Sequence, residues 1–144
     1  MGKRRKAREL ATQVLFHMEF SPGNPDEAFH LICENYRPSE TIRAFSKRLV
    51  CGVCDNKKSL DELITKSSQN WRLERMSRVD RCILRIGVFE LLFMEDIPPK
   101  VSIDEGVELG KLFGSEDSGG FINGVLDNIF STLKEKGKVL DKIK

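Results

Sequence analysis

The stretch Ile86-Gly87-Val88-Phe89-Glu90-Leu91-Leu92-Phe93-Met94 decides the fold that this sequence can adopt. Its apolar side chains cover nearly every side of a helix, whereas a surface helix shows a single apolar stripe. A helix with this pattern is buried, with other helices packed around it. We therefore predict a buried central helix that begins near Ser77.

Upstream of this segment, apolar residues recur at helical spacing between clear turn signals. A first helix carries one apolar stripe over residues 7–18, a second begins at Pro25 with Asn24 as its N-cap, and a third follows Ser39. Residues 55–59, Asp-Asn-Lys-Lys-Ser, are typical of a turn, so a separate short helix is predicted after them.

Downstream, Ser102 and Glu105 have the spacing of a capping box, which predicts a helix start at Ser102. Gly106 and Gly110 lie on one face of that helix and would let another helix approach closely. A last helix carries apolar residues on one face over residues 121–133. No alternating run of strand length is present, so the sequence predicts an all-α fold.

Length and composition exclude several classes of protein. The 144 residues suit one domain, and no run of about 18 apolar residues predicts a membrane span. Glu9 and Glu19 interrupt the segment behind the basic N-terminus, which argues against a signal peptide and favours a cytoplasmic protein. No glycine-rich phosphate loop or nucleophile–base motif is found, so we expect no catalytic residues and no cofactor.

Cys51 and Cys54 form a Cys-x-x-Cys pair that could suggest zinc or redox chemistry. Zinc needs four ligands, but there is no second pair, and His17 and His30 are widely separated. A redox pair is expected between a strand and a helix, and no such pattern is present. We therefore predict that both cysteines pack as small apolar residues and that there is no metal site.

Positive charge is concentrated at the N-terminus, in Lys3, Arg4, Arg5, Lys6 and Arg8, and the rest of the chain is net acidic. On a helical wheel, Phe16 and Phe20 lie opposite the apolar stripe, on the face of Arg5 and flanked by Arg8 and Thr12. Cations that hold phosphates beside a ring that stacks on a base suit single-stranded nucleic acid. A solvated terminus and a protein interface remain alternatives.

Two further stretches are candidates for binding. The polar loop within residues 114–127 opens a helix, where N–H groups suit phosphate, although Asp117 or Ser118 could cap that helix instead. Asp80, Arg81 and Arg85 share a polar flank of the central helix. Such a row is usually a set of surface ion pairs, or it is a strip on which a partner docks.

Taken together, these stretches resemble the NusB family of bacterial antitermination factors. The resemblance rests on the basic N-terminus running into Ala7-Arg8-Glu9-Leu10-Ala11, on residues 79–86 and 99–111, and on Phe121-Ile122-Asn123-Gly124-Val125-Leu126-Asp127. It implies a single helical domain with two halves that each resemble a three-helix bundle, about residues 1–73 and 74–144, around the central helix. It also implies no catalysis.

The resemblance further implies that the chain binds boxA of nascent RNA together with the ribosomal protein NusE, and that the complex helps RNA polymerase to read through terminators, chiefly in ribosomal RNA operons. A homodimer is possible when the chain is free. The alternatives are a protein-only adaptor and a stand-alone relative of the NusB-like domain of RNA cytosine methyltransferases.

Carried onto this chain, the resemblance assigns the RNA contacts to Lys3, Arg4, Arg5, Lys6, Arg8, Phe16, Asp117 and Phe121. It assigns Glu74 and Asp80 to the NusE contact, and the polar flank adds Arg81. The chain departs from the family at two of these places: Phe16 stands where tyrosine is frequent, and Gly120 stands where a basic residue is frequent. Gly106 and Gly110 also replace alanines, at a cost in helix propensity of about 1 kcal/mol each unless close packing compensates.

Overall fold

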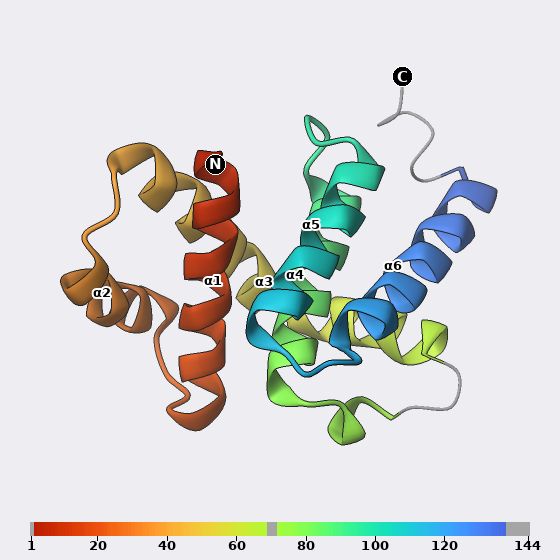
Figure 1. Ribbon diagram of the computed structural model, residues 1–144, viewed down its shortest axis with the longest axis horizontal. Coiled ribbons are helices and arrows are strands. Elements are labelled where there is room, and N and C mark those ends of the chain that lie inside the picture. Colours follow the sequence, from red (N-terminus) through yellow and green to blue (C-terminus); the bar gives the residue numbers. More distant parts are fainter. Residues whose placement is uncertain (1, 69–71, 138–144) are drawn as a thin grey trace.

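The computed structural model describes residues 2–68 and 72–137, which form six α-helices and one short 3-10 helix and contain no strand (Figure 1). The elements are α1 (Lys3–Phe20), α2 (Pro25–Tyr36), α3 (Glu40–Ser67), η1 (Leu73–Arg75), α4 (Arg78–Phe93), α5 (Pro99–Phe113) and α6 (Ser118–Glu135). The predicted all-α fold is confirmed. Within the described residues, no helix is long and apolar enough to cross a membrane.

Helix α4 is the centre of the fold, as the opening segment predicted. It packs against α1, α3, α5 and α6, and its residues from Cys82 to Leu91 are all buried. The helix begins where expected, because the Ser77 hydroxyl accepts a hydrogen bond of 3.0 Å from the Asp80 backbone N–H. The one charged residue in the middle of the segment, Glu90, is 1% exposed and therefore needs a partner inside the protein.

The long helix α3 joins the two sides of the molecule. In Figure 1, α1 and α2 lie on one side of it and α5 and α6 on the other, and α3 contacts α1, α2, α4 and α6. The predicted boundary between two halves, near residue 73, falls beside residues 69–71, which lie outside the described part of the chain. That boundary stays a prediction.

The predicted turn at residues 55–59 is wrong, because α3 continues through it without a break. The turn-forming side chains are satisfied inside the helix. The Asn56 amide donates to the Gly52 carbonyl at 2.8 Å, and the Ser59 hydroxyl donates to the Asn56 carbonyl at 3.0 Å. On the inner side of the same helix, Leu60 and Ile64 are completely buried. Tertiary packing therefore overrides the local preference for a turn.

The predicted capping box at Ser102 and Glu105 is also wrong. Helix α5 begins three residues earlier, at Pro99, with Pro98 in the N-cap position. Proline is favoured at the first helical position because its missing N–H is not needed there. Both side chains are then available for tertiary contacts: the Ser102 hydroxyl donates to Glu90 at 2.8 Å, and Glu105 accepts hydrogen bonds from Arg5.

The predicted close approach at Gly106 and Gly110 is confirmed, and the approaching helix is α6. Leu126 of α6 is fully buried between two glycines on two different helices. A Cβ atom at Gly87 of α4 or at Gly106 of α5 would lie 2.8 or 2.9 Å from its methyl groups. At Gly110, a Cβ atom would lie 2.7 Å from Ile122. The glycines therefore make room for α6, which compensates for their low helix propensity.

Candidate nucleic-acid and partner interface

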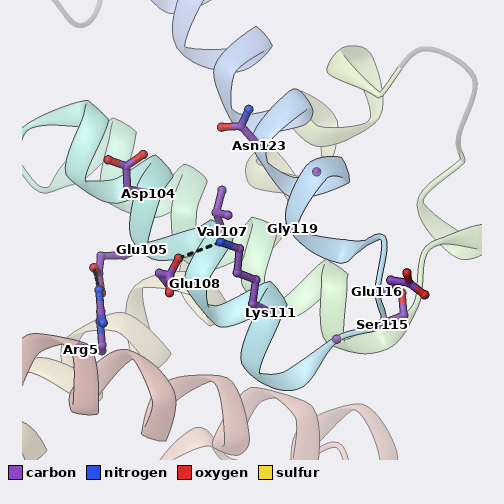
Figure 2. A pocket seen from close by; sticks show the side chains of 12 residues that line it. Arg5, Asp104, Glu105, Val107, Glu108, Lys111, Ser115, Glu116, Gly119 and Asn123 are labelled. Carbon is purple, nitrogen blue, oxygen red and sulfur yellow. Dashed lines mark hydrogen bonds and ion pairs between the residues drawn. The ribbon is translucent and has the colours of Figure 1, made fainter.

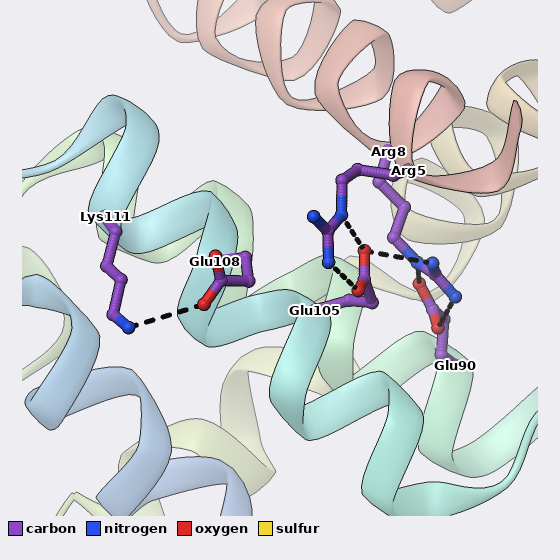
Figure 3. A network of polar contacts seen from close by, with 6 residues as sticks. All are labelled: Arg5, Arg8, Glu90, Glu105, Glu108 and Lys111. Carbon is purple, nitrogen blue, oxygen red and sulfur yellow. Dashed lines mark hydrogen bonds and ion pairs between the residues drawn. The ribbon is translucent and has the colours of Figure 1, made fainter. Parts of the chain in front are cut away.

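The five cations at the N-terminus lie on two sides of α1. Lys3, Arg4 and Lys6 are exposed, whereas Arg5 is half-buried and Arg8 is 3% exposed. Ion pairs with acids from α4 and α5 account for this difference, as Figure 3 shows. Only the first three are therefore open to an anionic ligand.

The Arg8 guanidinium makes two hydrogen bonds to Glu90 of α4, of 2.7 and 2.9 Å, in a buried site. Glu105 of α5 lies 3.6 Å from the same guanidinium. Arg8 was predicted to contact RNA, but its charge is matched and covered here. The helical wheel missed this because it describes one helix alone, and α4 and α5 cover the flank of α1 that holds Arg8 and Thr12.

Arg5 makes a similar two-bond contact with Glu105, at 2.7 and 3.0 Å (Figure 3). These hydrogen bonds lower the pKa of Glu105 and raise the pKa of Arg5, since each charged group stabilises the other. Arg5 and Arg8 thus brace α1 against α4 and α5. This pairing could not be read from the sequence because the acids lie about 80 to 100 positions further along the chain.

Phe16 and Phe20 form an edge-to-face pair on α1, with ring centres 5.1 Å apart. Phe16 is partly buried against the core, and Phe20 is 58% exposed. The cation that covers this pair is Arg78, whose guanidinium lies 4.7 Å from the centre of the Phe20 ring. Arg78 was not predicted as a site residue, although its place directly after the helix cap Ser77 was a usable signal.

Asp80 is distant in sequence from Asp117 and Phe121, and the structure brings the three residues together around one hollow. This α4–α6 hollow has a volume of about 390 Å³. Its lining is formed by Arg75, Met76, Ser77, Asp80, Ser115, Asp117, Ser118 and Phe121. The hollow combines an aromatic ring, carboxylate oxygens and one arginine, which are groups that bind bases and phosphates in single-stranded RNA.

Two acceptor groups at this hollow are not used within the described fold. Asp80 is 9% exposed, and its Oδ1 atom has no hydrogen-bond partner among the described residues. Asp117 is exposed at the N-cap position of α6, yet its side chain makes no capping hydrogen bond. The Ser118 hydroxyl instead accepts from the Ser115 N–H at 2.9 Å. The exposed Asp117 carboxylate can therefore accept hydrogen bonds from a ligand, whereas the unpaired Asp80 Oδ1 is itself buried.

The other residues predicted to contact a protein partner have different surroundings. Glu74 is exposed in η1. Arg81 is only partly exposed, because it donates to Glu19 of α1 at 3.0 Å. Arg85 completes this network: it is 5% exposed and binds Asp61 of α3 at 2.7 and 3.0 Å. Arg81 and Arg85 thus join α4 to α1 and α3, so most of the predicted docking strip lies inside the fold.

A pocket between α5 and α6 has a volume of about 970 Å³ (Figure 2). Four acids line it: Asp104, Glu105, Glu108 and Glu116. Its two cations, Arg5 and Lys111, are both paired with acids. Gly120 also lines the pocket and adds no charge to it. The pocket is therefore a poor match for phosphate groups.

Cys51 and Cys54 are free, half-buried thiols in the middle of α3. Burial raises the pKa of both. Within the described residues, no group of three or more His, Cys, Asp or Glu side chains is placed to hold a metal ion.

A helical scaffold with exposed cations at one end and a carboxylate-lined aromatic hollow elsewhere defines an all-helical binding protein. A family model described as the NusB family matches residues 5–131, and the chain belongs to this family. The transcription antitermination protein NusB of Desulforapulum autotrophicum is 51% identical over 131 residues, which cover 90% of this chain and 92% of the relative. The predicted resemblance is thereby confirmed.

Solved structures agree with this assignment. NusB of T. maritima matches with a TM-score of 0.82 and 36% identity, covering 89% of this chain and 90% of the other. A crystal structure of the antitermination factors NusB and NusE in complex with double-stranded RNA matches with a TM-score of 0.84 and 30% identity, covering 92% of this chain and 98% of the other.

Proposed function

We propose that this chain is an RNA-binding transcription antitermination factor. With the ribosomal protein NusE it would bind boxA of nascent RNA in the cytoplasm and help RNA polymerase to read through terminators, chiefly in ribosomal RNA operons. Membership of the NusB family supports the proposal, as do relatives described as transcription antitermination proteins.

The observation that carries the proposal is the α4–α6 hollow, in which Phe121 meets the exposed carboxylate of Asp117 beside the buried Asp80. A base can stack on the Phe121 ring while Asp117 accepts hydrogen bonds from its amino group or from a sugar hydroxyl. Arg75, on the rim of the hollow, is placed to balance a phosphate. Phe16, Phe20 and Arg78 add a second surface on which a base can stack.

We assign the phosphate contacts at the N-terminus to Lys3, Arg4 and Lys6, since these cations are exposed. Arg5 and Arg8 take a different part in the proposal, because their charges are used inside the fold. They would hold α1, and with it the three exposed cations, at a fixed place relative to α5.

For NusE, we retain Glu74 as the exposed candidate and Asp80 as a residue at the rim of the same hollow. NusE and RNA would then occupy adjoining surfaces, and each could strengthen the binding of the other. Arg81 would act indirectly by fixing α4 against α1 through Glu19.

The proposed activity is binding without catalysis. The curated relatives match over nearly their whole length, for example 92% of the Desulforapulum protein and 100% of the Geobacter sulfurreducens protein. These relatives are described as transcription antitermination proteins, which favours an antitermination factor over a relative of the RNA methyltransferases. A product in a methyl-transfer assay with a ribosomal RNA fragment would contradict it.

The test is the binding of a fluorescent boxA RNA, measured by anisotropy with and without NusE. Phe121→Leu removes the aromatic ring but keeps an apolar side chain against the core. Loss of one stacked base, at about 1–3 kcal/mol, corresponds to roughly a 5- to 150-fold weaker affinity. Asp117→Ala is expected to weaken binding severalfold, whereas Asp127→Ala, an exposed acid on the same helix, is the control and should leave it unchanged.

Each result has one interpretation. Binding of boxA RNA that is weakened at Phe121 and Asp117 supports the proposal. Binding of NusE without any binding of RNA would instead support a protein-only adaptor. RNA binding that is insensitive to both substitutions would show that the α4–α6 hollow is not the site.

A further inference from the structure

A smaller hollow lies where the N-terminal end of α1 packs against the start of α3, beside the paired Arg8, whose guanidinium is 5.6 Å from the centre of the Phe45 ring. Its volume is about 310 Å³. The lining of this α1–α3 hollow is formed by Lys3, Arg4, Thr41, Ala44, Phe45 and Arg48. Three cations and no acid therefore line it. Of these residues, Thr41, Phe45 and Arg48 belong to none of the motifs discussed above.

The cations of this hollow are available to a ligand. Lys3, Arg4 and Arg48 are all exposed. Among the described residues, neither Lys3 nor Arg48 has an ion-pair partner within 4.0 Å, and Arg4 pairs with Asp96 at 2.9 Å. Both members of that pair are about half exposed. Exposed pairs of this kind contribute little to stability, so Arg4 can exchange Asp96 for a phosphate at low cost.

The surroundings of the three cations also favour an anion. The Phe45 ring forms the floor, with the Arg4 guanidinium 4.9 Å from its centre, which restricts the arginine to the rim of the hollow. Thr41 lies in the first turn of α3, where the helix dipole is positive and its hydroxyl can donate a hydrogen bond. Asp96 pairs with Arg4, and nearby Arg4 and Arg48 both lower its pKa, with Arg4 having the larger effect.

We propose that the α1–α3 hollow binds a backbone phosphate of the RNA strand outside the segment that occupies the α4–α6 hollow. This inference rests on the proposed function and adds a second contact to it. Lys3 lies 13 positions before Phe16 on α1, which corresponds to about 20 Å along the helix axis. The bound strand therefore continues over the N-terminal end of α1 onto α3, so that flanking nucleotides contribute to affinity.

The test compares matched substitutions, one inside the hollow and one outside it, that remove a charge of the same sign. Arg48→Ala removes a cation from the hollow. Lys47→Ala removes a cation from the neighbouring position, whose side chain points towards Asp26 of α2, 3.7 Å away. Affinity for a single-stranded RNA that carries boxA and flanking nucleotides on both sides is measured at several salt concentrations.

For Arg48→Ala we expect severalfold weaker binding and a log–log salt slope that is smaller in magnitude by about 0.7, the value for one phosphate contact on a single strand. Lys47→Ala should leave the slope unchanged. Asp96→Asn removes the competing acid and should strengthen binding severalfold, whereas Asp127→Asn, the same change on α6, should have no effect.

Amide NMR signals of Thr41 and Ala44 in the wild-type protein provide a second measurement. They should shift when the extended RNA is added and not when an RNA of boxA alone is added. Equal affinities and slopes for the Arg48 and Lys47 variants, with no shift at Thr41, would overturn this inference while leaving the proposed function intact. Absence of any RNA binding by the wild-type protein would overturn both.

Discussion

The guanidinium of Arg8 and the carboxylate of Glu90 are joined by two hydrogen bonds, with both side chains almost completely buried. Arg8 comes from the basic N-terminus and Glu90 from the middle of the apolar central helix. The Ser102 hydroxyl also donates to Glu90, so three helices meet at one carboxylate. A chain segment that looked like a free cationic end is therefore anchored in the core.

Arg8→Met is expected to lower the free energy of unfolding by about 3–5 kcal/mol, because it removes the cation that balances the charge of the buried Glu90 carboxylate. Urea unfolding followed by circular dichroism measures this change. Replacing both residues, as in Arg8→Met with Glu90→Leu, should recover much of the loss. Arg4→Met is the control, since the exposed Arg4–Asp96 pair should contribute about 0–1 kcal/mol. A loss no larger than that of the control would contradict the structural role of Arg8.

The Arg5–Glu105 contact predicts a pH dependence. Arg5 lowers the pKa of Glu105 in the folded state, so the ionised carboxylate favours folding. This contribution is complete above the ordinary glutamate pKa of about 4.3 and is lost as the pH falls through the lower, folded-state pKa. In acid-unfolding series, Glu105→Gln should therefore show a shallower loss of stability below about pH 5 than the wild type. Glu108→Gln, at an exposed position on the same helix, should follow the wild-type curve.

Replacing a glycine by alanine should have opposite effects on stability at two positions of the C-terminal helices. At Gly110, the new methyl group would press on Ile122 and on the backbone at Gly119, so Gly110→Ala should destabilise by about 1–3 kcal/mol despite its better helix propensity. At Gly124, no atom lies within 4 Å of the added methyl group, so Gly124→Ala should stabilise by about 0.5–1 kcal/mol. Thermal unfolding of the two variants shows whether each is more or less stable than the wild type. Destabilisation by Gly124→Ala would show that α6 has a neighbour on that side.

The four cysteines should react with a thiol reagent at different rates. Burial raises the pKa of Cys82 to about 12, so almost no thiolate is present at neutral pH, and Cys33 is also buried. Cys51 and Cys54 are half-buried and should react first in the native protein. Cys82 should react only as fast as the protein unfolds. The Cys51→Ser, Cys54→Ser double variant should lack the fast phase, and fast labelling that persists in it would contradict this order.

The parts of the fold that could be predicted from the sequence are those that depend on apolar periodicity and on single capping residues. The buried helix α4, its Ser77 cap and the α2 start at Pro25 are all of this kind. The errors occur where a local signal competes with tertiary contacts. The turn formers at residues 55–59 lie inside α3, and Ser102 uses its hydroxyl on Glu90 instead of on a helix end.

The same distinction holds for the candidate site. The resemblance placed Asp117 and Phe121 among the binding residues, and the structure adds Asp80 to the same hollow. A helical wheel cannot show which flank of α1 its neighbours cover, so it grouped Arg8 with the open cations. Arg48 and Phe45 were missed because they acquire their setting only when α3 packs beside the basic end of α1.

The insertion of Leu126 between Gly87 and Gly106 links the side-chain volumes of three positions on three helices. A larger residue at either glycine leaves too little space unless position 126 becomes smaller, and a larger residue at 126 is excluded while both neighbours are fixed. We therefore expect the three positions to co-vary among relatives, with alanine at position 106 accompanied by a smaller or differently branched residue at position 126. Such linked changes would preserve the spacing between α4, α5 and α6, and with it the width of the hollow between α4 and α6.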